Sequence, residues 1–556
     1  MNNSRLVIAI VGMGPRGISL LERLISNTIE SKITDKIEFV LFDKNKDLGM
    51  GCHYHTLSKN LIVNTLASQI TMYYGKEMQN TPTFEGMNFY EWYRNNVSND
   101  VKETDYLSRA DLGRYLNYFF LEQEQRMKDN GITFNIVYKE VKGIEENSEF
   151  IEVKTDEKSY RVSKAILCLG HQENKELRDN KTYIGDILHT ASIRNLSDVE
   201  SVAVQGMGLT SFDVISELTE GRDGKFDRDE NGELYYIPSG KEPMIYLYSR
   251  TGIPLSGRAS NNDPEYIYKP KFFTIAAIDH IRSDKKQLDF EEDVLPLLIK
   301  ELEYAYETRS NGKKLDIDSF LNFENKLNKS SQEEFVESLI SHLEFDIEHS
   351  ALGRYDSPYK FCQDIIRDIR DVLRYAVDFK GLIPQSHKDF ITKWQPKFVR
   401  ICIGPPAIRI EQMKALIDAK ICNVGFANNP TVTQKGDKYI LKVSYDSEIL
   451  ETEVDFLISA IMPTLDFEKS TDSLICSLKE DYELFNRDNF FIGGFDINRD
   501  FQVIKKNGNP SDKLYGLGLA VEGSKYFTLV LGRPNMHSTF LYDSDKLAKT
   551  LLNNTF

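Results

Sequence analysis

The chain has 556 residues and a formal net charge of −16; 41% of its residues are hydrophobic and 28% are charged. This length is too great for one hydrophobic core, so we expect several domains in a globular protein. An acidic chain without a dense lysine and arginine run argues against a nucleic-acid partner, and the lack of about 18 consecutive apolar residues argues against a membrane span.

The six cysteines are scattered along the chain without a C-x-x-C pair. We therefore expect neither a disulfide framework nor a dithiol redox centre, and the pattern favours the reducing cytoplasm. The N-terminal segment has none of the features of a signal peptide. No set of histidines, cysteines and acids has workable ligand spacing, so we expect no bound metal.

The first predicted element is a buried strand over residues 6–11 (LVIAIV), which runs directly into a G-x-G-x-x-G turn and then a helical pattern. In such a turn Gly12 permits the tight bend, Gly14 lets a pyrophosphate approach the backbone, and Gly17 lets the helix pack on the strand. The helix N-terminus offers free N–H groups and a partial positive charge to phosphates. Taken alone, the glycines also fit a tight strand–helix turn without a ligand.

A second predicted strand, residues 37–42, ends in Asp43. An acid at this position accepts hydrogen bonds from a ribose. Strand, turn, helix and acid together favour a dinucleotide site, lined also by Pro15 and Arg16.

A predicted helix over 111–128, a strand over 132–138 and a strand-rich stretch over 139–162 follow, and an apolar segment, 165–171, closes the unit. Arg109, near the start of this helix, is a candidate to meet a substrate carboxylate. A solvated surface charge is the alternative.

The same pattern recurs at residue 202, where a strand leads into Gly206 and Gly208 and then a helix. Ser211 or a neighbour replaces the third glycine, so a second strand–helix unit without ligand stays open. The next strand, 244–248, is followed by Arg250, and an arginine there suits the 2′-phosphate of NADP. This second turn is therefore a candidate NADPH site, with Leu209 and Thr210 beside its glycines.

The region 270–395 places apolar residues at i, i+3 and i+4 and is predicted to be helical. One interpretation is a helical subdomain that covers a cleft. The other is a substrate wall, since small ligands bind between domains, with Arg354 and Tyr355 in a loop ahead of a helix.

After the helical region the order of the first unit is repeated, with a helix over 410–419, a strand over 421–427, alternating strands over 431–454 and a strand over 456–461. The two halves resemble FAD/NAD(P)-binding oxidoreductases, and more closely a bacterial branch related to the flavin-dependent N-hydroxylating monooxygenases of amino acids and amines. The resemblance rests on the segments GMGPRGISLLERL, ILCLGH, QGMGLTSFDVISEL and GPPAIRIEQMKALIDA, and it covers about residues 1–260 and 396–556.

The resemblance implies FAD at the first turn and NAD(P)H at the second, with NADPH favoured by Arg250 and NADH left open. Asp43, where such enzymes more often carry glutamate, and the missing third glycine are departures from the pattern. The predicted cofactor-binding residues are Gly12, Gly14, Pro15, Arg16, Gly17, Asp43, Gly51, Cys52, Asn64, Gly170, Gly206, Gly208, Leu209, Thr210, Arg250, Gly516 and Gly518. The candidate catalytic residues are Asn64 and His537, and the candidate substrate residues are Arg109, Arg354 and Tyr355.

The predicted fold is α/β, with two Rossmann-like dinucleotide-binding domains and a helical insertion. The expected segments are 1–195 and 466–556 for the FAD domain, 196–270 and 396–465 for the NAD(P) domain, and 271–395 for the insertion. The expected activity is N-hydroxylation of a small amino acid or amine with O₂. A flavin-dependent reductase or dehydrogenase and a non-catalytic FAD/NAD(P)-binding sensor or assembly protein are the alternatives, and homo-oligomer formation stays open.

Overall fold

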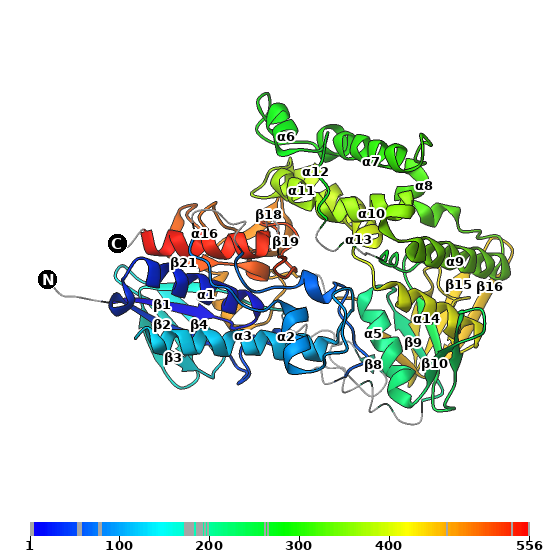
Figure 1. Ribbon diagram of the computed structural model, residues 1–556, viewed down its shortest axis with the longest axis horizontal. Coiled ribbons are helices and arrows are strands. Elements are labelled where there is room, and N and C mark those ends of the chain that lie inside the picture. Colours follow the sequence, from blue (N-terminus) through cyan, green and yellow to red (C-terminus); the bar gives the residue numbers. More distant parts are fainter. Residues whose placement is uncertain are drawn as a thin grey trace.

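A computed structural model describes residues 5–52, 58–75, 81–171, 183–184, 193, 196, 199–260, 263, 266–462, 465–534 and 538–553. Two parallel sheets form separate layered units, and a helical region lies along one side of both (Figure 1). The expectation of a mixed α/β fold with two parallel sheets is confirmed.

The first sheet has six strands in the order β20-β21-β7-β1-β2-β3, and only β20 runs antiparallel to its neighbour. Its central strands are apolar on both faces because helices cover them. The C-terminal strand β21 pairs with β7, so the end of the chain completes the sheet that its beginning started. The strands are β1 (Leu6–Val11), β2 (Ile37–Phe42), β3 (Thr133–Val137), β7 (Lys164–Leu167), β20 (Gln502–Ile504) and β21 (Pro510–Gly516).

Helices and a small antiparallel sheet surround this first sheet. Helix α1 packs between α3 and α16, and the three-stranded meander β4-β5-β6 precedes β7. The remaining elements of this unit are α1 (Pro15–Glu30), α2 (Phe89–Asn96), α3 (Arg109–Asp129), β4 (Val141–Glu146), β5 (Ile151–Thr155), β6 (Ser159–Val162), α15 (Ser473–Leu478), β18 (Leu484–Arg487), β19 (Phe490–Phe495) and α16 (Thr539–Asn553).

The second sheet is parallel throughout, in the order β13-β12-β9-β17-β8. It repeats the first unit, including a three-stranded meander, β14-β15-β16, ahead of the returning strand β17. Its elements are β8 (Tyr183–Ile184), β9 (Ser201–Gln205), α5 (Leu209–Leu218), β10 (Lys225–Arg228), β11 (Leu234–Ile237), β12 (Met244–Tyr248), α14 (Ala407–Asp418), β13 (Cys422–Asn423), β14 (Thr431–Lys435), β15 (Lys438–Ser444), β16 (Ile449–Val454) and β17 (Phe456–Ser459).

One predicted strand of the second unit is much shorter than expected. The segment 421–427 was predicted to be extended, but only Cys422–Asn423 pairs with β12. The side-chain oxygen Oδ1 of Asn423 accepts a hydrogen bond from the Gly425 N–H at 2.8 Å, which turns the backbone away from the sheet.

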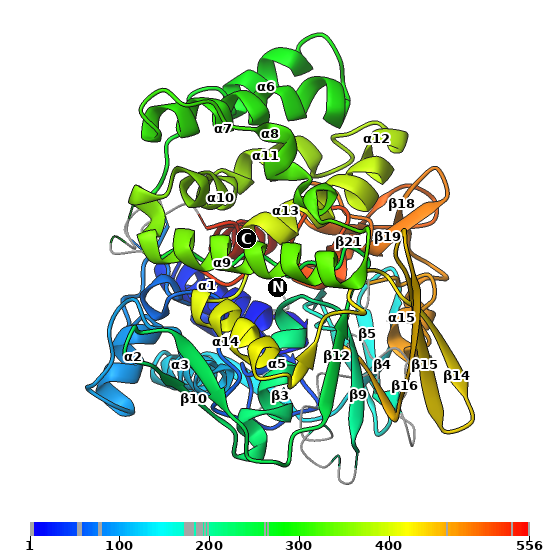
Figure 2. The same ribbon diagram turned by 90° about the vertical axis from the view of Figure 1, so that its right-hand side faces the viewer.

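The helical region contains α6 (Ile275–Arg282), α7 (Leu295–Arg309), α8 (Ile317–Leu321), α9 (Gln332–Asp356), α10 (Pro358–Asp368), α11 (Arg370–Val377), α12 (Pro384–Asp389) and α13 (Gln395–Cys402). Most of its apolar side chains form their own core, but α9 lies beside α14 and shares the core of the second sheet (Figure 2). The helical region is therefore anchored to the second sheet, and the predicted domain boundaries stay a prediction. None of the helices in the described ranges is long and apolar enough to cross a bilayer.

Candidate functional site

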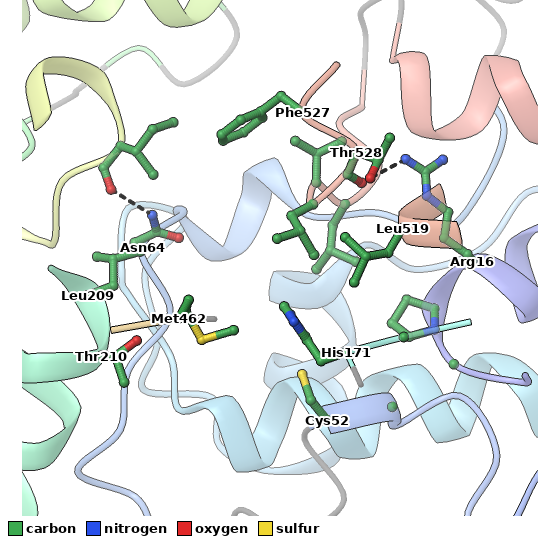
Figure 3. A pocket seen from close by; sticks show the side chains of 18 of the residues that line it. Arg16, Cys52, Asn64, His171, Leu209, Thr210, Met462, Leu519, Phe527 and Thr528 are labelled. Atoms are coloured by element: carbon green, nitrogen blue, oxygen red, sulfur yellow. Dashed lines mark hydrogen bonds between the residues drawn. The ribbon is translucent and has the colours of Figure 1, made fainter. Parts of the chain in front are cut away.

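One cavity of about 1950 Å³ lies where the two sheets and the helical region meet. Both glycine turns open into it, together with α10, α11, α13 and the segment 527–533. Figure 3 shows Leu209 and Thr210 on one side of this space and Arg16 on the other. A ligand at the first turn and a ligand at the second turn therefore share one space.

The three glycines of the first turn meet different constraints. Gly12 has φ +97°, a backbone conformation that favours glycine. A Cβ on Gly17 would lie 2.1 Å from the carbonyl oxygen of Gly12, so the helix packs on the turn as predicted. A Cβ on Gly14 would meet only the Gly51 Cα, at 3.5 Å, and Gly14 lines the cavity.

The N-terminus of α1 is an anion site by its chemistry. Its first turn has no side-chain cap and no acidic residue, so its N–H groups are left for a ligand. Asp43 lines the same space, and its Oδ2 accepts a hydrogen bond from the Met13 N–H at 2.8 Å. Burial raises the pKa of Asp43 from its ordinary value. These residues fit the pyrophosphate and ribose of a dinucleotide.

Arg16 links the glycine turn to the C-terminal part of the chain. Its guanidinium donates to the carbonyl oxygens of Phe540 and Thr528, at 3.1 and 3.0 Å. Its Nε is buried and has no hydrogen-bond partner among the described residues. Burial lowers the pKa of Arg16 to about 10. The side chain therefore holds residues 528 and 540 beside the turn.

The second turn also leaves open space beside its second glycine, although it lacks the third glycine of the motif. A Cβ on Gly208 would meet only Leu255, at 4.0 Å, and the first turn of α5 again lacks a side-chain cap and an acid. Ser211 takes the place of the third glycine, and its hydroxyl donates to the Gly208 carbonyl at 2.6 Å. The serine is thus accommodated by a local hydrogen bond, and the space beside Gly208 stays open.

Arg250 and Arg109 both line the cavity, but they differ in exposure and in pairing. Arg250 is exposed after β12, as a 2′-phosphate ligand requires. Arg109 is paired with Asp213 of α5 at 3.0 Å, which joins the first unit to the second. A substrate carboxylate at Arg109, as predicted, would therefore compete with Asp213 for the guanidinium group.

The remaining predicted residues of the first unit surround the middle of the cavity (Figure 3). Asn64 Nδ2 donates to the Ile403 carbonyl at 3.2 Å, so its amide is tied to the end of α13. Cys52 is accessible within the cavity, and desolvation raises the pKa of its thiol. Gly51 and Gly170 line the same space.

Five predicted residues in the described ranges do not line the cavity: Gly17, Arg354, Tyr355, Gly516 and Gly518. Gly518 packs on the Arg16 side chain and Gly516 on Val521, so both serve close packing beneath the site. Arg354 and Tyr355, predicted in a loop, lie in the last turn of α9 after a kink at Gly353. Arg354 is buried and paired with Asp368, and the Tyr355 hydroxyl donates to Asp263 at 3.1 Å. His537 lies outside the described residues.

Several cavity residues were missed by the sequence analysis. His171 lies in the centre of the view in Figure 3, and burial lowers the pKa of its imidazole. Arg367 and Arg370 belong to α10 and α11, and Arg533 and Phe527 come from the C-terminal part. Arg367 and Arg370 are three residues apart in the sequence, but they lie on either side of the junction between α10 and α11, so their spacing did not indicate what they contact.

The chain is similar in sequence to a family model and to known proteins. Residues 9–172 match a family model described as FAD-NAD(P)-binding. The chain is 29% identical to nitrosuccinic acid synthase npaA of Aspergillus oryzae, over 98% of this chain and 92% of the relative. It is 25% identical to the L-aspartate N-monooxygenase (nitrosuccinate-forming) of Streptomyces davaonensis, over 99% and 98%. The ornithine N-hydroxylase KtzI of Kutzneria sp. 744 aligns over the full length of both chains, with 13% identity and a TM-score of 0.48.

The family model and the two sequence relatives confirm the resemblance stated from the sequence. Residues 9–172 belong to an FAD-NAD(P)-binding domain. The relatives come from a fungus as well as from bacteria, which is wider than the bacterial branch that the motifs indicated.

Proposed function

We propose that this protein is an FAD-dependent, NADPH-using monooxygenase that hydroxylates the amino nitrogen of L-aspartate. The observation that carries the proposal is that both glycine turns, each at an uncapped helix N-terminus, open into one cavity. Relatives that match nearly the whole chain are named for L-aspartate N-monooxygenation and nitrosuccinate formation, which supports the substrate.

The overall reaction balances as R–NH₂ + O₂ + NADPH + H⁺ → R–NHOH + NADP⁺ + H₂O. Bound FAD supplies the redox chemistry, which takes a hydride from NADPH and activates oxygen. The N-terminus of α1 and Asp43 hold the first dinucleotide, and the N-terminus of α5 with Arg250 holds the second. The choice of NADPH over NADH rests on Arg250.

The substrate amine must lose its proton before it can attack oxygen. Burial lowers the pKa of His171, which favours the neutral imidazole, and a neutral imidazole has a nitrogen lone pair that accepts a hydrogen bond from an amine. Its place in the lining of the cavity makes it the best candidate for this task in the part of the chain that the structure describes. Asn64 is a candidate to hold the substrate or the cofactor from the opposite side.

The proposal is tested by following NADPH consumption and product together. Purified protein with FAD, NADPH and O₂ should form an N-hydroxylated product from L-aspartate, and NADPH consumption should rise when the substrate is added. NADPH consumption without such a product, from L-aspartate or from a panel of amino acids and amines, would instead favour a reductase. Absence of NADPH-dependent flavin reduction would favour a binding protein. A cytoplasmic location and the oligomeric state stay predictions.

A further inference from the structure

Three arginines from two distant parts of the chain line one wall of the cavity. Arg367 is the penultimate residue of α10, Arg370 begins α11, and Arg533 follows the segment 527–532. We call Arg367, Arg370 and Arg533 the arginine cluster. The side chains of Arg367 and Arg533 are 11% and 20% exposed, so they are largely removed from bulk water.

The cluster carries more positive charge than its protein partners neutralise. Asp364 lies 3.2 Å from Arg367 and 3.7 Å from Arg354. Asp368 pairs with Arg354 and lies 3.9 Å from Arg533. Arg354, Arg367 and Arg533 therefore share these two carboxylates, and Arg370 pairs with neither. Among these four guanidinium groups and two carboxylates, two positive charges are in excess.

Arg370 is the cluster member with the least protein charge around it. Its Nη2 donates to the Cys402 sulfur at 3.5 Å, and its guanidinium stacks on the Phe527 ring at 4.6 Å. The carboxylate next to it in the sequence, that of Asp371, pairs with Arg374 at 2.6 Å. A partly buried guanidinium with this environment retains donors for a bidentate carboxylate.

The excess charge is unfavourable in the absence of an anion. Burial, together with the like charges of Arg367 and Arg370, lowers the pKa of Arg533 to about 10. Buried charge without a counter-charge destabilises a fold, and a bound anion relieves that penalty.

The position of the cluster connects it to the first glycine turn. Phe527, on which Arg370 stacks, precedes Thr528, whose carbonyl accepts a hydrogen bond from Arg16 at 3.0 Å. Figure 3 shows Phe527, Thr528 and Arg16 along the same side of the cavity. An anion bound to the cluster would therefore lie on the same side of the cavity as Arg16, which connects this side to the first turn.

We propose that the arginine cluster binds the two carboxylates of a small dicarboxylate and so selects the substrate. The assignment of that dicarboxylate as the oxidised substrate rests on the proposed function. L-Aspartate with an uncharged amine carries two negative charges, which equal the excess on the cluster. Guanidinium groups bind carboxylates through two parallel N–H···O bonds, so L-asparagine, which lacks one carboxylate, binds more weakly.

The test measures equilibrium binding of succinate and L-aspartate to the FAD-loaded full chain by calorimetry. Succinate has both carboxylates and no amine, so its binding is independent of turnover. Arg370→Gln and, separately, Arg533→Gln should weaken succinate binding by about 10- to 100-fold, the effect of losing a hydrogen bond to a charged group. Arg370→Lys should restore part of the loss, and Arg228→Gln, on the exposed hairpin β10–β11, should leave binding unchanged.

The outcomes separate this proposal from the proposed function. Dicarboxylate binding that depends on the cluster, without any N-hydroxylated product, would support the site and refute the reaction. A wild-type protein that binds neither succinate nor L-aspartate would overturn the site, and so would variants with unchanged succinate affinity. Variants that lose FAD content or NADPH affinity, with succinate binding intact, would assign the cluster to a cofactor phosphate and overturn the proposal.

Discussion

Gly14 and Gly17 lie three residues apart in the first turn and face opposite surroundings. Gly14 faces open cavity, whereas Gly17 is pressed against the Gly12 carbonyl. The same residue type therefore serves ligand approach at one position and helix packing at the other. The structure predicts a different result for a larger side chain at each position.

Gly14→Val is expected to keep the fold and lose the flavin. The added side chain enters space that a pyrophosphate would occupy, so FAD affinity should fall at least about tenfold. The flavin absorbance of purified protein and its circular dichroism report the two properties. Gly143→Val is the control, since a Cβ there lies 3.6 Å from its nearest neighbour and Gly143 is outside the cavity lining. Stoichiometric flavin in Gly14→Val would refute the site.

Gly17→Ala is expected to destabilise the protein directly. Its Cβ would lie 2.1 Å from the Gly12 carbonyl oxygen, so the helix or the turn must shift. Overpacking of this kind reduces the free energy of unfolding by about 1–3 kcal/mol. Urea unfolding of the FAD-free protein measures it, and an unchanged midpoint would contradict the packing described here.

Arg250 allows the coenzyme to be tested at a single residue. Arg250→Ala should raise the KM for NADPH by about tenfold, through loss of charge-assisted contacts to the 2′-phosphate, and leave the KM for NADH nearly unchanged. Steady-state kinetics with both coenzymes measure the ratio, with Arg228→Ala as the control for a lost surface charge. Equal changes for both coenzymes would argue against a 2′-phosphate contact.

At the scale of elements, the helical region contains a buried histidine that makes its stability depend on pH. His342 of α9 stacks on Phe323, with ring centroids 3.8 Å apart. Burial lowers its pKa to about 4, although the nearby Asp346 opposes that shift. In the unfolded chain the imidazole has the ordinary pKa of 6.5. As the pH falls below this value, the unfolded state therefore binds a proton before the folded state does.

The contribution of neutral His342 to stability is complete above about pH 6.5 and is lost as the pH falls towards 4. For this group alone, the free energy of unfolding should be about 2 kcal/mol smaller at pH 5 than at pH 7. Chemical unfolding at both pH values measures the difference. His342→Gln should reduce the pH dependence, whereas His280→Gln, at an exposed position, should not. Equal pH dependence in wild type and His342→Gln would contradict this account.

Local patterns in the sequence predicted the elements that carry the cofactor turns. The apolar run ahead of Gly12, the helical spacing after Gly17 and the acid after β2 are short-range features, and each has one structural interpretation. The arginine cluster was missed because its members come from α10, α11 and the segment after Phe527 and are brought together only in the folded chain. Gly516 and Gly518 were predicted to contact a cofactor because glycine allows close approach of a ligand. In the fold, the close neighbours are the side chains of Val521 and Arg16, which the sequence does not reveal.

At the scale of the whole molecule, the duplication places two dinucleotide turns around one cavity, and the helical region supplies its positive wall. We propose that the domains have the segments predicted from the sequence, and this arrangement supports that proposal. The first sheet is completed by β21 from the C-terminal part. The chain therefore passes from the first unit to the second and later returns to the first. This connection keeps the two turns and the arginine cluster in one space.

The central claim is that oxygen from O₂ is transferred to the nitrogen of L-aspartate in this cavity. The most direct measurement is mass spectrometry of the product formed with FAD, NADPH, L-aspartate and ¹⁸O₂. We expect an N-hydroxylated product that carries one ¹⁸O atom from the gas and forms only when NADPH is present. NADPH oxidation with hydrogen peroxide as the only oxygen product, or an N-oxygen that derives from water, would contradict it.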